Sequence, residues 1–161
     1  MPLTIKLRVI DISDDGKPLA GAAVYLWHCD REGRYSLYSD GVTVENYLRG
    51  VQEARADGSI TFTSIFPAAY AGRWPHIHFE VYPSLAKATK ATSKLRTSQL
   101  ALPRDASMAV YATTGYQASI SNLRQTSLET DNVFSDGHSL QLAKVTGGVE
   151  GGYTASLTIP V

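Results

Sequence analysis

Short segments of alternating apolar and polar residues run through the chain and limit the folds open to it. The first covers residues 3–9 and places Leu, Ile, Leu and Val at every second position. Because successive side chains of a strand point to opposite faces, this alternation predicts a half-buried β-strand. Similar patterns or short apolar runs occupy 24–29, 60–62, 77–82, 139–145 and 154–159. The chain therefore reads as a succession of strands.

Turn-forming sequences separate these segments, among them Asp14-Asp15-Gly16, Arg31-Glu32-Gly33 and Ala56-Asp57-Gly58. Only residues 119–126 and parts of 86–101 have a weakly helical pattern. A chain of 161 residues is long enough for one hydrophobic core. We therefore expect an all-β fold, a two-sheet antiparallel β-sandwich with long loops and a few short helices, in a single domain over 1–161.

The segment 16–24 supports this fold class but no particular function. Pro18 presets a turn, and Gly21 permits tight backbone geometry before a buried strand. The segment resembles the entry to prealbumin-like sandwiches, which include both enzymes and inert binding modules.

Charge and composition exclude several partners. Fifteen basic residues balance fifteen acidic ones and form no stripe that could neutralise a row of phosphates, so nucleic acid is not expected. Apolar runs fall short of the roughly 20 residues that span a bilayer, so we expect a soluble chain without a membrane span. Cys29 is the only cysteine and leaves the cellular compartment open. The abrupt opening on a strand, without a targeting segment, suggests the mature or trimmed core of a longer bacterial protein.

A His-x-His pair is the first candidate for chemistry. In a strand, His76 and His78 share one face while Ile77 and Phe79 share the other. Two imidazoles on one face can meet one metal ion. The alternative is a pair of strand histidines satisfied by ordinary hydrogen bonds.

Tyr70 lies just before this pair, in the turn Pro67-Ala68-Ala69-Tyr70, where the chain can carry a phenol toward the histidines. A phenol with an ordinary pKa near ~10 becomes a phenolate beside a trivalent cation. Anionic oxygens together with imidazoles suit ferric iron better than copper(I) or structural zinc. A tyrosine at the amphipathic rim of the fold is the alternative.

Several ordered motifs resemble those of the intradiol ring-cleavage dioxygenases, the family of protocatechuate and catechol dioxygenases. They are Val24 to Asp30, Gly33-Arg34-Tyr35-Ser36, Asp57-Gly58, Pro67 to Tyr70 and Arg73-Trp74-Pro75-His76-Ile77-His78-Phe79. The resemblance runs from about Asp11 to Pro103 and fades beyond it.

The resemblance implies that Tyr35, Tyr70, His76 and His78 bind non-haem Fe(III), with water or hydroxide as a fifth ligand. Tyr70 and His78 would be axial, and the other two equatorial. Tyr38 competes with Tyr35 for the first position. His28 and His138 match no ligand position of the family and are expected to be structural or exposed.

The implied reaction is the cleavage of a small aromatic diol by dioxygen between its two hydroxyl-bearing carbons, giving a muconate-type dicarboxylic acid. Tyr70 would take up a substrate proton, and Arg73 would stabilise negative charge that develops on the ring. Gln99 resembles a family glutamine near the active site. For Arg73, the alternative is a surface guanidinium stacked on Trp74.

Two other classes of protein remain open. A non-catalytic sandwich that binds carbohydrate or protein would use exposed aromatics such as Trp74, Tyr111 and Tyr116. A zinc hydrolase would use the two histidines with Glu80 as a weak third ligand. For the dioxygenase we expect a monomer with an open pocket, because the chain has no room for the helical segment through which catechol dioxygenases dimerise. The preferred catechol is left open.

Overall fold

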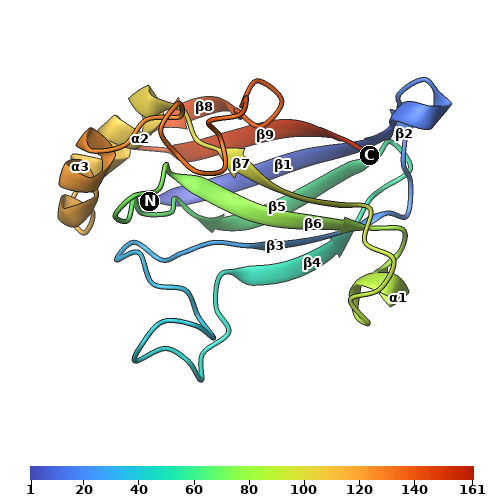
Figure 1. Cartoon of the computed structure of the whole chain (residues 1–161), viewed down its shortest axis with the longest axis horizontal. Helices are drawn as coiled ribbons and strands as arrows, with labels where there is room; N and C mark the ends of the chain where they lie inside the picture. The colour runs from blue at the N-terminus through green and yellow to red at the C-terminus, as the bar shows by residue number, and fades with distance from the viewer.

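The computed structural model describes all residues, 1–161, and shows two β-sheets packed face to face (Figure 1). The first sheet is built around β1 (Pro2–Asp11), which pairs on one side with β2 (Lys17–Pro18) and β5 (Ser59–Ile65). On its other side β1 pairs with β9 (Gly152–Pro160), which pairs in turn with β8 (Lys144–Gly148). The β1–β9 pair is parallel, so the sandwich is not wholly antiparallel.

The second sheet has the order β4-β3-β6-β7 and is antiparallel throughout. Its strands are β3 (Ala23–Trp27), β4 (Arg49–Glu53), β6 (His76–Tyr82) and β7 (Arg96–Ala101). On β6, Ile77, Phe79 and Val81 are buried against the first sheet. The alternate residues, beginning with His76 and His78, lie on the opposite face of the sheet. The period of two in the sequence thus separates a core face from a face that is free for chemistry.

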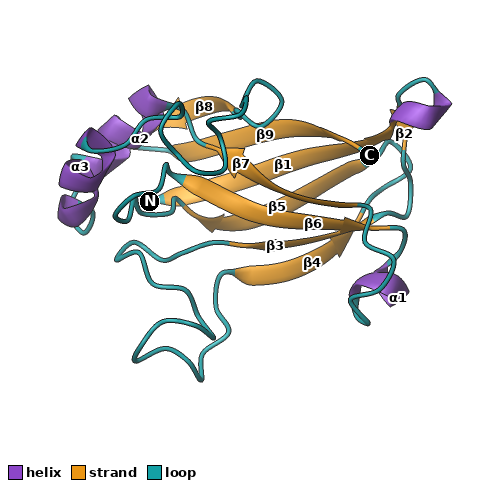
Figure 2. Cartoon of the chain, viewed as in Figure 1, coloured by secondary structure: helices purple, strands orange, loops and turns teal.

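Short helices occupy the two ends of the sandwich (Figure 2). α2 (Arg104–Tyr111) and α3 (Gln117–Arg124) lie at the end where β6 begins, whereas α1 (Leu85–Ala88) and the 3-10 turn Ile12–Asp14 lie at the other. None of these helices is long and apolar enough to cross a membrane. The expected all-β sandwich with a few short helices is confirmed.

One expectation about local structure was wrong in part. The segment 139–145 was expected to be a strand, but only its last two residues belong to one, β8. Turn hydrogen bonds from the amides of Gln141 and Leu142 to the carbonyl of His138 bend the backbone there. Leu140 is 72% exposed, so this apolar residue does not face the core.

Parts of 86–101 were expected to be weakly helical, and residues 86–88 belong to α1. The remainder includes β7, whose backbone pairs with β6 from His76 to Val81. Pairing with an existing strand edge outweighs a weak local helix propensity. The helix expected over 119–126 lies at 117–124, and α2 was not anticipated.

Candidate metal centre

The histidine pair stands at the start of β6. His76 is buried and His78 half-buried, and both side chains lie on the sheet face turned away from the core. The neighbouring strands place Trp27 of β3 and Gln99 of β7 directly opposite His78. Strand geometry therefore brings the two imidazoles together, as the spacing of the pair predicted.

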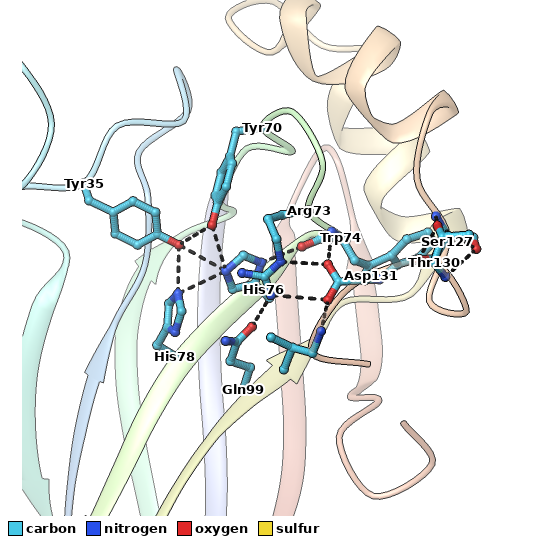
Figure 3. Close-up of polar contacts among 11 residues, drawn as sticks. Tyr35, Tyr70, Arg73, Trp74, His76, His78, Gln99, Ser127, Thr130 and Asp131 are labelled. Carbon is cyan, nitrogen blue, oxygen red and sulfur yellow. Dashed lines mark hydrogen bonds and ion pairs between the residues drawn. The ribbon is translucent and has the colours of Figure 1, made fainter. Parts of the chain in front are cut away.

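Two loops bring phenols to the same point (Figure 3). Tyr35 comes from the long connection between β3 and β4, and Tyr70 from the turn between β5 and β6. The Tyr35 oxygen lies 3.1 Å from Nε2 of His76 and 3.1 Å from Nε2 of His78. The Tyr70 oxygen lies 3.3 Å from Nε2 of His76 and 3.4 Å from the Tyr35 oxygen. Four residues separated by up to 43 positions in the sequence thus meet side by side.

The spacing of these four atoms fits the ligand set of one ion. The two Nε2 atoms are 3.0 Å apart, and bonds of about 2 Å to a common ion place neighbouring ligands about 3 Å from each other. The remaining pair, the Tyr70 oxygen and Nε2 of His78, forms no hydrogen bond. The donor set of two oxygens and two imidazoles is the kind that ferric iron prefers.

Hydrogen bonding and stacking orient the imidazoles. Nδ1 of His76 lies 2.5 Å from the carbonyl of Trp74, and because a carbonyl only accepts, Nδ1 carries the proton. Nε2 of His76 then presents a lone pair to the centre of the group, the usual arrangement of a metal-binding histidine. The ring of His78 stacks on Trp27.

Burial sets the protonation of the four groups. It is the main reason that the pKa of His76 falls to about 3 and that of His78 to about 4, so both imidazoles are neutral. It also raises the pKa of Tyr35 and Tyr70, so in the absence of a cation both phenols keep their protons. The positive charge of Arg73 is the second cause that lowers the two histidine pKa values.

The Tyr35 loop is held by an arginine and a glycine. Arg49 donates from Nε to Oγ of Ser36 at 2.9 Å, and from Nη2 to the Ser36 carbonyl at 2.6 Å. Gly33 has a φ of +87°, and a Cβ at that position would lie 3.1 Å from Cβ of Tyr70. The absence of a side chain at Gly33 therefore lets the two tyrosine loops approach.

The turn before Tyr70 is pinned by α2, α3 and the residue before α3. The hydroxyls of Tyr111 and Tyr116 donate to the carbonyls of Pro67 and Phe66. The amide of Ala69 donates to Oγ of Ser119 at 3.1 Å. These contacts tie the C-terminal part of the chain to the tyrosine turn.

Arg73 points into the group from the opposite side to Tyr35 (Figure 3). Its Nη2 donates to Oε1 of Gln99 at 2.6 Å, and its Nε donates to Oδ2 of Asp131 at 2.8 Å. The alternative in which Arg73 stacks on Trp74 was wrong, since it is Arg104 whose guanidinium lies over that ring. Sequence reasoning missed Asp131, which lies in a segment without motif or periodicity.

The other candidates lie elsewhere. Tyr38 is 67% exposed and its ring packs on Arg49, so it does not compete with Tyr35 for the group. His28 is buried, with one ring nitrogen bonded to the carbonyl of Cys29 and the other to Oγ of Ser64. His138 is half-buried and outside the group.

The features that favoured the other two classes of protein are absent. Glu80, the third ligand of the zinc interpretation, accepts from Tyr82 and Lys94 instead. No group of three or more His, Cys, Asp and Glu side chains in the structure is arranged to hold a metal ion. The aromatics expected to be exposed in a binding module are all buried: Trp74, Tyr111 and Tyr116.

The fold and the group together define a β-sandwich protein with a mixed phenol and imidazole donor site. The family model described as dioxygenase matches residues 1–109, which is more than half of the chain. The chain belongs to the intradiol ring-cleavage dioxygenase family.

Individual relatives match over shorter stretches. A chlorocatechol 1,2-dioxygenase of Rhodococcus opacus is 40% identical over 55 residues, which are 34% of this chain and 21% of the relative. A catechol 1,2-dioxygenase of Acinetobacter lwoffii is 34% identical over 68 residues, 42% of this chain and 24% of the relative. The match thus spans less than a quarter of either relative.

Solved structures match over nearly the whole chain. An intradiol ring-cleavage dioxygenase from Tetranychus urticae superposes with a TM-score of 0.83 at 24% identity, covering 99% of this chain and 80% of that one. The dioxygenase domain of a carbohydrate-binding fusion protein from Streptomyces sp. SirexAA-E superposes with a TM-score of 0.67 at 26% identity, covering 99% and 79%. The sandwich of residues 1–161 is therefore that of the family.

Proposed function

We propose that residues 1–161 form a single dioxygenase domain that cleaves catechols between their hydroxyl-bearing carbons. Dioxygen would supply both oxygen atoms of the muconate-type dicarboxylic acid product. The observation that carries the proposal is the convergence of Tyr35, Tyr70, His76 and His78, whose four donor atoms lie 3.0–3.4 Å apart in five of their six pairs.

The four side chains would hold Fe(III). Two phenolates and one hydroxide balance a tripositive ion, so the loaded centre is neutral and tolerable in a partly buried site. When bound, the ion supplies Lewis acidity and a template for a chelated diol, and it draws electron density from the ring.

Tyr70 is the phenol that we assign to proton transfer. Its oxygen contacts two atoms of the group, whereas the Tyr35 oxygen contacts three. Burial raises its pKa, which makes the released phenolate a ready acceptor of a substrate proton. Arg73 supplies positive charge to the same site. Gln99 bonds Arg73 from the neighbouring strand and would border the substrate.

The substrate class is that of small aromatic diols. The two relatives reported above are named for catechol and chlorocatechol. Three of the four donor residues, Tyr35, Tyr70 and His78, are only half-buried, so the site can be reached from solvent. An open site leaves room for substituents on the substrate ring. We also propose that a monomer suffices for activity.

Colour and oxygen uptake test the proposal. Phenolate-to-iron charge transfer should turn the protein burgundy to red after loading with ferric iron, and catechol should shift the colour. Oxygen consumption should equal the muconate formed, across a panel of catechol, protocatechuate, hydroxyquinol and chlorocatechols. A protein that stays colourless and takes up no oxygen after loading would contradict the proposal.

A matched pair of variants tests the ligand set. Tyr35→Phe should lose most of the charge-transfer band and the activity, because it removes one phenolate. Tyr38→Phe should retain both, because that exposed ring lies outside the group. If Tyr38→Phe lost the band and the activity while Tyr35→Phe kept them, Tyr38 and not Tyr35 would be the first tyrosine ligand.

A further inference from the structure

Asp131 is buried completely, 58 residues beyond the arginine with which it pairs. It lies between α3 and β8, outside the part of the chain that the family model matches. Resting on the proposed function, we infer that Asp131 is a positioning residue for the reaction: it fixes the guanidinium of Arg73 in the one orientation that faces the substrate.

The hydrogen bonds of Arg73 support this role. A guanidinium has five N–H groups. The Nε–H and one N–H of Nη2 go to the Asp131 carboxylate, at 2.8 and 3.4 Å, and the other N–H of Nη2 goes to Gln99. The two N–H groups of Nη1 bond neither Asp131 nor Gln99, so they are the donors left for an anionic substrate.

The carboxylate is itself immobile. Oδ2 of Asp131 also accepts from the amide of Trp74 at 2.7 Å, and Oδ1 accepts from the amide of Val133 at 2.8 Å. Because both oxygens are bonded to backbone, they define a rigid platform. A forked contact with such a platform sets the plane of the guanidinium as well as its position.

Burial explains why a carboxylate is needed at this place. The side chain of Arg73 is only 15% exposed, and an unpaired guanidinium there would turn toward water. Pairing with Asp131 keeps the arginine in the site before substrate arrives, so no reorganisation is required during the reaction.

A purely structural role must be separated from this one. The Trp74 amide bonds Asp131, and the Trp74 carbonyl bonds His76, so Asp131 could instead act by orienting an iron ligand. If Asp131 orients His76, its loss would lower the iron content and change the charge-transfer band. If it positions Arg73, its loss would lower kcat while the iron content and the band stay unchanged.

The experiment is a double-mutant cycle of Asp131→Asn and Arg73→Ala, with Asp136→Asn, an exposed neighbour, as the matched control. We expect D131N to keep its iron and its band, to lower kcat by ~10²-fold and to change KM little. D136N should match the wild type. The double variant should be as slow as R73A alone, because Asp131 acts only through Arg73. If D131N alone does not fold, the comparison of the double variant with R73A still tests the inference. The double variant has no unpaired buried charge that would prevent folding.

A readout that requires neither iron nor turnover completes the test. In the full chain before iron is added, the Nε–H of Arg73 should give a slowly exchanging NMR signal that D131N loses and D136N retains. Any of three results would overturn the inference. D131N could keep the wild-type kcat and NMR signal, it could lower kcat further in the R73A background, or its iron content could fall together with kcat. Absence of oxygen uptake by the wild type would instead refute the proposed function, and the NMR signal would still decide whether Asp131 fixes Arg73.

Discussion

The indole of Trp27 lies flat against the imidazole of His78, with ring centroids 4.8 Å apart and planes inclined by 6°. The two residues are cross-strand partners of β3 and β6, so the backbone register produces the stack. A face-on neighbour restricts rotation of the imidazole about its Cβ–Cγ bond. The stack therefore holds one proposed iron ligand in place before the ion binds.

Trp27→Ala should weaken iron binding, because His78 would no longer be confined to one orientation. Substitutions behind a metal ligand typically lower affinity 10–100-fold, and we expect a loss of about tenfold. Ferric titration followed by the charge-transfer band measures it. Trp27→Phe keeps a flat ring and should recover most of the affinity. Equal affinities for the Ala variant and the wild type would show that the stack does not orient the ligand.

Arg49→Lys should loosen the loop that carries Tyr35. A lysine cannot reproduce the forked contact with Ser36, so the loop should exchange its amide hydrogens faster and the charge-transfer band should weaken. Hydrogen exchange over residues 35–39 reports the first effect and visible absorbance the second. Arg34→Lys is the control, since the Arg34 side chain is exposed and bonds Asp30 rather than Ser36. Identical exchange in the two variants would contradict the role of Arg49.

Strands whose alternation faces a buried layer could be predicted from the sequence. β1 and β6 follow the period of two, because one face of each packs into the core. The alternation over 139–145 was misleading, because the backbone of the segment pairs with β7 only at an isolated bridge between Ala101 and Leu142. An apolar pattern predicts a strand only where a partner edge is available, and that depends on residues far away in the sequence.

Most of the proposed ligands could be predicted from the sequence because they lie close together in it. Tyr70, His76 and His78 lie within nine consecutive residues, so local geometry relates them to one another. Tyr35 required the resemblance to the family, since nothing in its own segment indicates where the loop returns. Asp131 could not be predicted, because its pairing with Arg73 arises only when the C-terminal segment folds over the tyrosine turn.

Ser119→Ala should destabilise the turn before Tyr70. The amide of Ala69 is buried and would lose its acceptor, which costs about 1–3 kcal/mol of the free energy of unfolding. Urea denaturation of the iron-free chain measures the change. Ser121→Ala, at an exposed position of the same helix, should stay within about 0.5 kcal/mol of the wild type. Equal losses in the two variants would show that helix propensity, and not the contact with the turn, is responsible.

The iron-free chain should lose stability as the pH falls from 6.5 toward about 4. Burial lowers the pKa of His28 from 6.5 to about 4, so in this range the unfolded chain binds a proton that the folded chain does not. Lower pH therefore favours unfolding, and His76 and His78 act in the same direction. His28→Asn removes one of these groups and should flatten the decrease in unfolding free energy, measured by urea denaturation across the range.

His138→Gln provides the comparison, because His138 is only half-buried and lies outside both sheets. If His28→Asn left the pH dependence as steep as in the wild type, the lost stability would belong to other groups.

Loading with ferric iron should separate the contribution of His28 from those of His76 and His78. Iron occupies Nε2 of His76 and His78 in the proposed centre, but not the ring of His28, which bonds Cys29 and Ser64. The His28 part of the decrease should therefore persist in the loaded protein, since only burial of that ring produces it.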